Sequence, residues 1–469
     1  MGKDKRNLIF LGIFAVFFGA LFLMGEPVYT GDTFQYENQM VMREPGYPLL
    51  IQFLRFLSPE GHYRILTALQ NLLAVAANTA VIAFLRRRFH LNMPVSLLFA
   101  VILLAPHVMT PVFASTHLVL TNSLMTEGIL FSMYPLAVMS LLDMMWSGKP
   151  VGRESFRTIG LFFLLSLVRG QMMVLFVVWF LTAYVLTVRN AVKRTEETGN
   201  RANALELAEN IAKQGLLAAL AAVIIVFAAR TVVVRVYNYC EQGLFVDTAS
   251  GKAMAFANVL YVADREDGAA IEDDALRELF YEMYDSADAD RMNYKYAPSG
   301  ILNKAAYHEK CHDELNFTYF AEPAKRYVGD RKGIYTDRYQ RLMIEIDEIA
   351  SQMSAQLMPR VIGRYAMNYM NIIALGFVRT VAYENVFLAW YAVLIYAVAV
   401  ALTILLWRKN AGGMAASFMA VMLLTIVGNV CATALMIQCI SRYMIYNLPL
   451  FYMAGFLEIL ELLKLKERK

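Results

Sequence analysis

Long apolar runs recur along the chain and constrain its fold more than any other feature. Several approach the ~20 residues that an α-helix needs to cross the hydrocarbon core of a bilayer. Hydrophobic residues make up 58% of the 469 residues and charged residues only 17%, which is little charge for a soluble protein of this length. We therefore predict an all-α integral membrane protein. It would have about ten transmembrane helices, at roughly residues 8–24, 64–85, 94–114, 125–146, 157–169, 171–188, 214–236, 386–407, 413–435 and 443–462.

Basic clusters orient these predicted spans. They follow the second, fourth, sixth and eighth spans, for example at residues 86–88 and 408–409. With ten crossings all of them lie on one side, which the positive-inside rule makes the cytoplasm. We expect a bacterial inner membrane, both termini in the cytoplasm, and the loop at residues 25–62 on the outer, periplasmic face. The first span is expected to stay as an anchor, because no small-residue cleavage site follows it.

The predicted spans divide the chain into three parts. Residues 1–236 form a membrane core with seven spans, residues 237–385 a polar insert on the outer side, and residues 386–469 the last three spans. By count, residues 237–384 carry 23 Asp and Glu against 16 Lys and Arg, which argues against nucleic acid as a partner. The insert is expected to be helical, with Asp273 and Asp274 in the early turns of a helix at 267–292. A second helix at 336–358 would start at Thr336 as N-cap and end or kink at Pro359, followed by an interfacial helix at 360–385.

The junction after the first span is the most informative stretch for function. Residues 31–50 read GDTFQYENQMVMREPGYPLL, so Asp32 and Glu37 lie just beyond a hydrocarbon-length helix. A carboxylate at the membrane boundary can meet a lipid-borne substrate from the bilayer and a polar one from water. This placement makes the junction the first candidate for a catalytic site.

Ionisable residues also mark the outer ends of other predicted spans. Glu127 opens the fourth, Arg169 ends the fifth and Arg442 opens the tenth. Each alone has an ordinary structural explanation, since an arginine can reach lipid headgroups and a glutamate can cap a helix. Together with Asp32 they suit transfer of a group from a lipid phosphate to an alcohol: arginine holds phosphate, and a carboxylate accepts the hydroxyl proton.

These pieces resemble the GT-C glycosyltransferase superfamily, multi-span enzymes that use polyprenyl-phosphate sugars. The likeness covers the membrane part, roughly residues 1–236 and 386–469, and not the insert. It is carried by GDTFQYE (31–37), EPGYPLLIQFL (44–54), MTEGILF (125–131), LLSLVRGQ (164–171) and SRYMIYNLPLF (441–451).

The resemblance implies roles for single residues. Asp32 would be the catalytic base and Glu127 a second acidic site residue, while Arg169 and Arg442 would face the phosphate or the acceptor. Many relatives have an acidic pair at the junction where this chain has Asp32 followed by Thr33, so a role for Glu37 and a divalent metal stay open. Further candidates for substrate binding are Arg43, Tyr36, Tyr47 and Tyr443.

A rival motif lies in the insert. His308, Glu309 and His312 satisfy H-E-x-x-H, which on a helix binds zinc through both histidines. The surroundings are polar, and only Asp313 or Glu322 offers a third ligand, so we expect a solvated helix face and keep His308 and His312 as weak metal candidates. Two insert cysteines, Cys240 and Cys311, could pair in an oxidising compartment or remain free thiols.

The sequence therefore favours an inverting glycosyltransferase. It would move a sugar from a polyprenyl-phosphate donor to a hydroxyl of a glycan or protein acceptor, with no resident cofactor assigned. The alternatives are a polymerase or ligase of lipid-linked glycans with a diphosphate-linked donor, a membrane transporter, and a zinc metalloprotease. A transporter should place ionisable residues at mid-membrane, where this chain has few.

Overall fold

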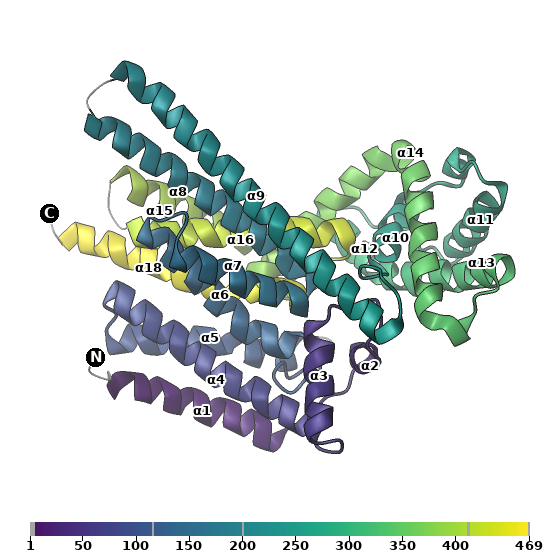
Figure 1. Ribbon diagram of the computed structural model, residues 1–469, viewed down its shortest axis with the longest axis horizontal. Helices are drawn as coiled ribbons and strands as arrows, with labels where there is room; N and C mark the ends of the chain where they lie inside the picture. The colour runs from purple at the N-terminus through teal and green to yellow at the C-terminus, as the bar shows by residue number, and fades with distance from the viewer. Residues whose placement is uncertain (1–4, 115–116, 199–200, 410–412, 468–469) are drawn as a thin grey trace.

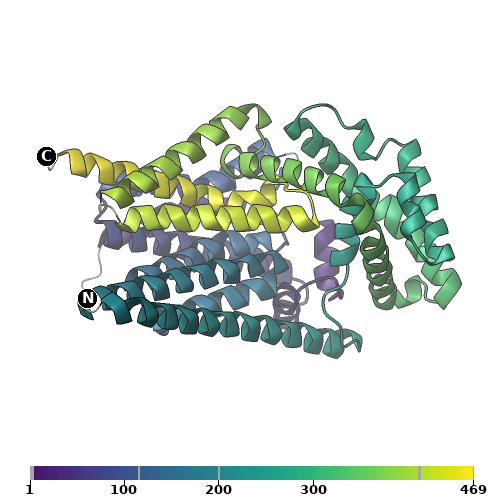
Figure 2. The same cartoon turned by 90° about the horizontal axis from the view of Figure 1, so that it is seen from above.

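Long parallel and antiparallel helices form a bundle, and the insert sits at one end of it. The computed structural model describes residues 5–114, 117–198, 201–409 and 413–467. Within these ranges the chain is helical, without β-strands and with one isolated bridge between Val28 and Ser123. Both termini lie at the end of the bundle opposite the insert (Figure 1), and the view from above shows the same division (Figure 2).

Eight helices of the described residues are long and apolar enough to cross a membrane. Two more, α7 (Arg153–Val168) and α18 (Leu448–Glu467), pack in the bundle against α6 and α16 but are not among the eight. Helix α7 has only 16 residues, and α18 carries five charged residues, Glu458, Glu461, Lys464, Lys466 and Glu467. The all-α membrane-type fold is thus confirmed, while ten crossings remain a prediction. The eight are α1 (Lys5–Met24), α4 (His62–Phe89), α5 (Met93–Phe113), α6 (Glu127–Ser147), α8 (Val174–Thr198), α9 (Arg201–Gln242), α15 (Ala389–Arg408) and α16 (Gly413–Met436).

The bundle is held by apolar faces that meet inside it. Helix α1 shows this most simply: Phe10, Phe14 and Phe18 recur every four residues on one face and are fully buried, whereas Val16 on another face is exposed. The buried face packs against α4. The exposed apolar faces suit contact with lipid.

The junction is fastened to the loop before α6. Helix α2 (Gly31–Glu37) begins after Thr30, whose backbone N–H donates to Thr33 Oγ1 at 2.9 Å, and the Thr33 hydroxyl donates to the backbone oxygen of Leu124 at 2.9 Å. Backbone bonds of Val28 to Asn122 and Leu124 add to this tie. Helix α3 (Gly46–Leu57) then lies across the end of the bundle, as an interfacial helix would (Figure 1).

The insert has a core of its own, in which Phe256, Phe280 and Phe320 are fully buried. Helix α11 (Asp274–Ala289) is capped by Asp273, whose carboxylate accepts from the backbone N–H of Leu276 at 2.8 Å. The other α-helices of the insert are α10 (Gly251–Val262), α12 (Ile301–Glu314), α13 (Glu322–Lys332) and α14 (Tyr339–Ala382).

Two predictions about α14 need correction. Thr336 is not its N-cap, because Thr336–Arg338 forms a separate 3₁₀ turn before the helix begins. Of the two alternatives for Pro359, that it ends the helix or kinks it, the first is wrong, because α14 continues to Ala382 as one 44-residue element. Figures 1 and 2 show it as two arms that meet at a bend, which an internal proline explains because it removes one backbone hydrogen bond and crowds the preceding turn. The predicted separate helix at 360–385 is the second arm.

Candidate functional site

Five charged side chains from four parts of the chain form one network at the insert end of the bundle. Arg43 Nη2 lies 2.6 Å from Asp32 Oδ1, and Arg169 Nη1 lies 2.7 Å from Glu127 Oε1. Arg442 joins the two pairs, with Nη1 4.0 Å from Asp32 Oδ2 and Nε 4.0 Å from Glu127 Oε1. The structure therefore brings together Asp32, Glu127, Arg169 and Arg442, which the sequence places far apart.

Helix ends position the inner pair. Glu127 is the first residue of α6 and is 1% exposed, and a helix N-terminus favours a carboxylate. Arg169 directly follows α7, where a helix C-terminus favours a cation. The hydroxyl of Thr126 links them: it accepts from Arg169 Nη1 at 3.1 Å and donates to Glu127 Oε2 at 3.1 Å. Both oxygens of Glu127 are thus engaged by neighbours.

Aromatic rings and amides hold the guanidinium groups in place. Tyr443 lies under both Arg169 and Arg442, whose guanidinium carbons are 4.5 and 5.0 Å from the ring centroid. Arg43 lies 5.0 Å from the centroid of Tyr36 and donates through Nε to the side-chain oxygen of Gln35 at 2.7 Å. Cation–π contacts of this kind fix the planes of the arginines before any ligand binds.

The network borders two cavities. The first, of about 540 Å³, is lined by Asp32, Arg43, Arg169 and Arg442 on the bundle side and by residues of the insert on the other. The second, of about 580 Å³, is lined by Glu127, by the end of α5 and by charged residues of α12 and α14. Both volumes fall in the ~300–1,000 Å³ range of small-molecule sites.

A short partition separates the two cavities. The side-chain amide of Gln438 donates to Asp313 Oδ1 at 2.9 Å, and both residues line both cavities, as do Ile440 and Arg442. Gln438 Oε1 is buried and has no hydrogen-bond partner among the described residues. Arg442 is therefore the one arginine of the network that faces both spaces.

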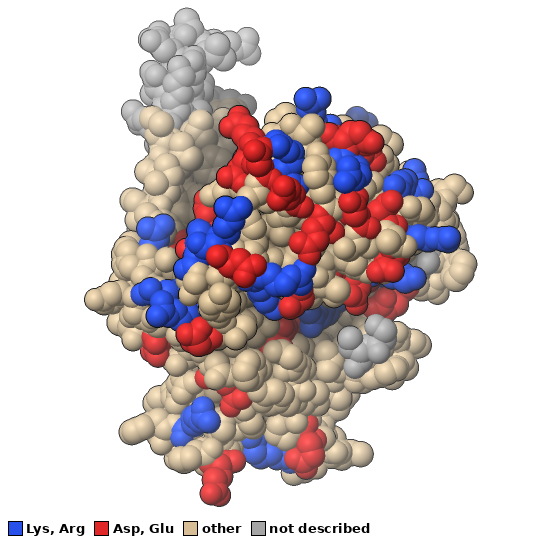
Figure 3. All heavy atoms as spheres, turned by 90° about the vertical axis from the view of Figure 1, so that its right-hand side faces the viewer, with Lys and Arg blue, Asp and Glu red and all other residues tan. Residues whose placement is uncertain are grey.

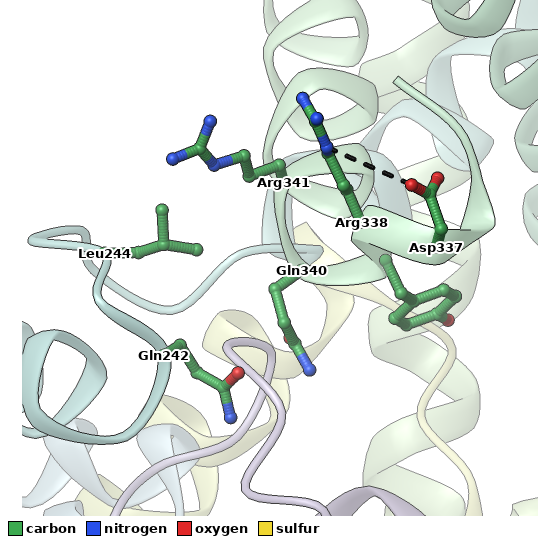
Figure 4. A pocket seen from close by; sticks show the side chains of 7 residues that line it. Gln242, Leu244, Asp337, Arg338, Gln340 and Arg341 are labelled. Atoms are coloured by element: carbon green, nitrogen blue, oxygen red, sulfur yellow. Dashed lines mark ion pairs between the residues drawn. The ribbon is translucent and has the colours of Figure 1, made fainter. Parts of the chain in front are cut away.

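A further hollow, drawn in Figure 4, lies where the insert meets the junction and the end of α9. Gln340 accepts from the backbone N–H of Val41 at 3.0 Å, and Gln242 donates to the backbone oxygen of Gln39 at 3.0 Å. These contacts hold the loop that carries Arg43 against the insert. The hollow is lined by Gln242, Leu244, Asp337, Arg338, Tyr339, Gln340 and Arg341, and none of the five network residues lines it.

Two predicted substrate-binding residues do not reach the cavities. Glu37 turns away: its carboxylate accepts from the Tyr29 hydroxyl at 2.8 Å and lies 3.8 Å from His62 Nε2. Tyr47 is fully buried and donates to Gln70 at 2.8 Å, so it supports the loop before α6 and lines neither cavity. Of the aromatic candidates, Tyr36 and Tyr443 line the first cavity.

The two histidines of the H-E-x-x-H motif face the core of the insert, so the expected solvated helix face is wrong. His308 is fully buried with Nε2 at 2.8 Å from the amide oxygen of Asn258, and His312 lies 3.2 Å from the backbone oxygen of Met254. Glu309 pairs with Arg379 at 2.6 Å. Burial lowers the pKa of His308 well below its usual value, and no group of three potential metal ligands occurs in the described ranges.

The cysteines are unpaired. Cys240 is exposed and Cys311 is buried, and both are free, as are Cys431 and Cys439. The possible bridge between Cys240 and Cys311 is therefore not formed, and the thiol alternative holds.

Three polar residues of the site are not predicted from the sequence. Gln35 and Gln438 are uncharged, and Asp313 is predicted only as a metal ligand, although Gln438 stands out as an amide within the apolar stretch before Arg442. That position was the one available signal. Asp313 also carries a lowered pKa, chiefly because His312 donates to it.

Comparison with known proteins gives no relative: no family model matches the sequence, and no curated protein or solved structure matches it significantly. The likeness to GT-C glycosyltransferases rests on the short motifs alone. The geometry of the network must therefore carry any functional conclusion.

Proposed function

We propose that this protein is an inverting, GT-C-type glycosyltransferase that moves a sugar from a polyprenyl-phosphate donor to a hydroxyl of an acceptor. One observation supports the proposal above all others. Three arginines and two carboxylates meet beside a cavity at the end of a bundle of membrane-type helices. A lipid phosphate and a water-borne acceptor can meet at such a place.

The charge of the network favours a monophosphate donor. Three guanidinium groups and two carboxylates give a formal charge of +1 (3 − 2). A sugar phosphodiester of a polyprenol carries one negative charge, which this excess neutralises, whereas a diphosphate-linked donor carries two. Because arginine also binds phosphate in a bidentate manner, we prefer the transferase to a polymerase or ligase of diphosphate-linked glycans.

The proposed reaction uses Asp32 as base. Its Oδ1 is held by Arg43, and its Oδ2 faces Arg442 with the side chain 28% exposed, so Oδ2 is free to accept the acceptor's proton. The acceptor oxygen bonds to the anomeric carbon from the face opposite the phosphate. The bond from that carbon to the phosphate oxygen breaks, and its electron pair stays on the phosphate, where Arg442 and Arg169 stabilise the added charge.

Glu127 fits a positioning role better than a proton-transfer role. Its two oxygens contact Arg169 and Thr126, and it is almost fully buried. We propose that it aims Arg169 and Arg442 at the phosphate. Since Asp32 and Glu127 are both engaged by arginine, the residues present do not fit a divalent metal, and no step is assigned to one.

The proposed location is the outer face of a bacterial inner membrane. The insert and helix α2, which carries Asp32, lie at the end of the bundle away from both termini (Figure 1), and the basic clusters that follow the even-numbered predicted spans favour a cytoplasmic position for the termini. The insert end displays interspersed acidic and basic side chains, as a water-facing surface does (Figure 3).

Labelled polyprenyl-phosphate sugars, incubated with purified protein and membrane extract, test the proposal. We expect Asp32→Asn to lower the turnover of transfer about 10²–10⁴-fold, the usual contribution of a general base. Glu26→Gln is the matched control, because Glu26 is a junction carboxylate that is 90% exposed. Transfer at the wild-type rate by Asp32→Asn would remove Asp32 as the base, and consumption of only diphosphate-linked donors would favour the polymerase or ligase.

A further inference from the structure

The wall of the first cavity that faces the arginine network contains a π-helical turn. Leu315–Ala321 joins α12 to α13 with this wider helical winding, and Asn316 and Phe317 line the same cavity as Asp32 and Arg442. π-Helical turns are rare and are frequently found at functional sites, because the extra residue turns side chains away from their regular positions.

Asn316 is a buried amide without a partner. The residue is only 5% exposed and lines the cavity, and none of the hydrogen bonds among the described residues involves its side chain; its amide atoms are not among the fully enclosed ones, so the cavity reaches them. A buried polar group is normally hydrogen-bonded, and an amide both donates and accepts. Such a group is suited to a ligand hydroxyl. Asn316, Phe317 and Thr318 also form an N-x-T glycosylation sequence, and the burial of Asn316 argues against its use.

Phe317 adds an apolar surface next to this amide. Its side chain is 55% exposed and lines the cavity, so one face of the ring is open to a ligand there. An aromatic face beside hydrogen-bonding groups matches the two sides of a sugar ring, whose C–H face is apolar and whose rim carries hydroxyls. A polypeptide acceptor would instead need an extended groove with backbone partners.

We infer that the π-helical turn is the acceptor subsite and that the acceptor is a saccharide. Phe317 stacks on the sugar ring and Asn316 binds its hydroxyls, which presents another hydroxyl to Asp32 on the opposite wall. This inference rests on the proposed function, because it assigns the acceptor of that reaction. The cavity of about 540 Å³ admits a sugar or two of a longer glycan.

Acceptor kinetics test the inference. The probes are a panel of methyl glycosides and a panel of short serine- and threonine-containing peptides, each with the labelled polyprenyl-phosphate donors. We expect Phe317→Ala to raise the KM for glycosides about tenfold, as loss of a stacking partner does. The donor KM, and slow hydrolysis of the donor without acceptor, stay at wild-type values. Phe317→Tyr keeps the ring and restores the KM.

Phe245→Ala is the matched control, because Phe245 is 58% exposed on the outer side and lines neither cavity. An unchanged glycoside KM in Phe317→Ala, or transfer to peptides in place of glycosides, overturns the inference and leaves the proposed function standing. If the wild type consumes no polyprenyl-phosphate sugar, the proposed function fails. Binding of the same glycosides, measured by saturation-transfer NMR, then tests the subsite on its own. Binding that Phe317→Ala abolishes supports the subsite, and no binding by the wild type overturns it.

Discussion

Removal of Arg169 should destabilise the protein, because it leaves the buried carboxylate of Glu127 without its closest cation. Glu127 is 1% exposed and its closest cation is Arg169 at 2.7 Å, so Arg169→Met leaves a carboxylate buried beside a cation 4.0 Å away. Breaking a buried pair by removing one partner costs about 3–5 kcal/mol. Because Arg442 still compensates in part, we expect a loss near the low end, about 3 kcal/mol.

The double variant Arg169→Met, Glu127→Gln should recover most of that loss. It removes both charges, and a glutamine can keep the hydrogen bond with Thr126. We expect a coupling energy of about 2 kcal/mol between the two positions, within the range for contacting residues. Unfolding by SDS titration in mixed micelles, monitored by tryptophan fluorescence, measures Arg169→Met, Glu127→Gln and the double variant against the wild type.

An exposed ion pair supplies the control. Lys252 and Glu348 lie 3.4 Å apart with side chains 54% and 51% exposed, so Lys252→Met should cost no more than about 1 kcal/mol. The reasoning is refuted if Arg169→Met has the same free energy of unfolding as the wild type, or if the double variant is no more stable than Arg169→Met alone.

Four further outcomes are expected. Gly46→Ala should lower stability by about 1–3 kcal/mol, since its Cβ would lie 2.8 Å from a backbone oxygen of α7, while Gly31→Ala, with open space around it, should not; thermal melting compares them. Because burial lowers the pKa of His308, its neutral form stabilises the insert fully above pH ~6.5, and this stability is lost as the pH falls. Wild-type melting temperature should therefore drop more between pH 7.5 and 5.5 than that of His308→Gln, and equal drops would contradict the neutral buried state. Exposed Cys240 should react with a membrane-impermeant maleimide in spheroplasts, whereas protection until lysis would reverse the proposed topology. EDTA should leave sugar transfer unchanged, and a loss that added Mg²⁺ or Mn²⁺ restores would contradict the metal-free site.

Much of the site could be predicted, because charged residues at the ends of apolar runs are easily recognised in a sequence. Arg169 and Arg442 each stand where hydrophobic residues stop, and such positions gather at a bundle end. Which face of a short helix turns inward is harder to predict. Asp32 and Glu37 are five residues apart, which at 3.6 residues per turn sets their side chains about 140° apart, so only one could face the cavity.

Long-range packing decided the remaining features. The spacing of His308 and His312 places both on one face of α12, but a sequence does not state whether that face meets water or α10. Gln438 and Asp313 are 125 residues apart and share a hydrogen bond that no local pattern implies. The π-helical turn likewise has no recognisable signal in the sequence.

The place of Arg442 between the two cavities has a consequence for inhibition. A single guanidinium cannot orient fully toward two anions on opposite sides at once, so a compound that draws it to one side weakens the hold on a ligand at the other. Two such compounds would antagonise each other although they never touch. A neutral molecule that bridges the Gln438–Asp313 partition does not compete for the Arg442 guanidinium and would block both cavities together.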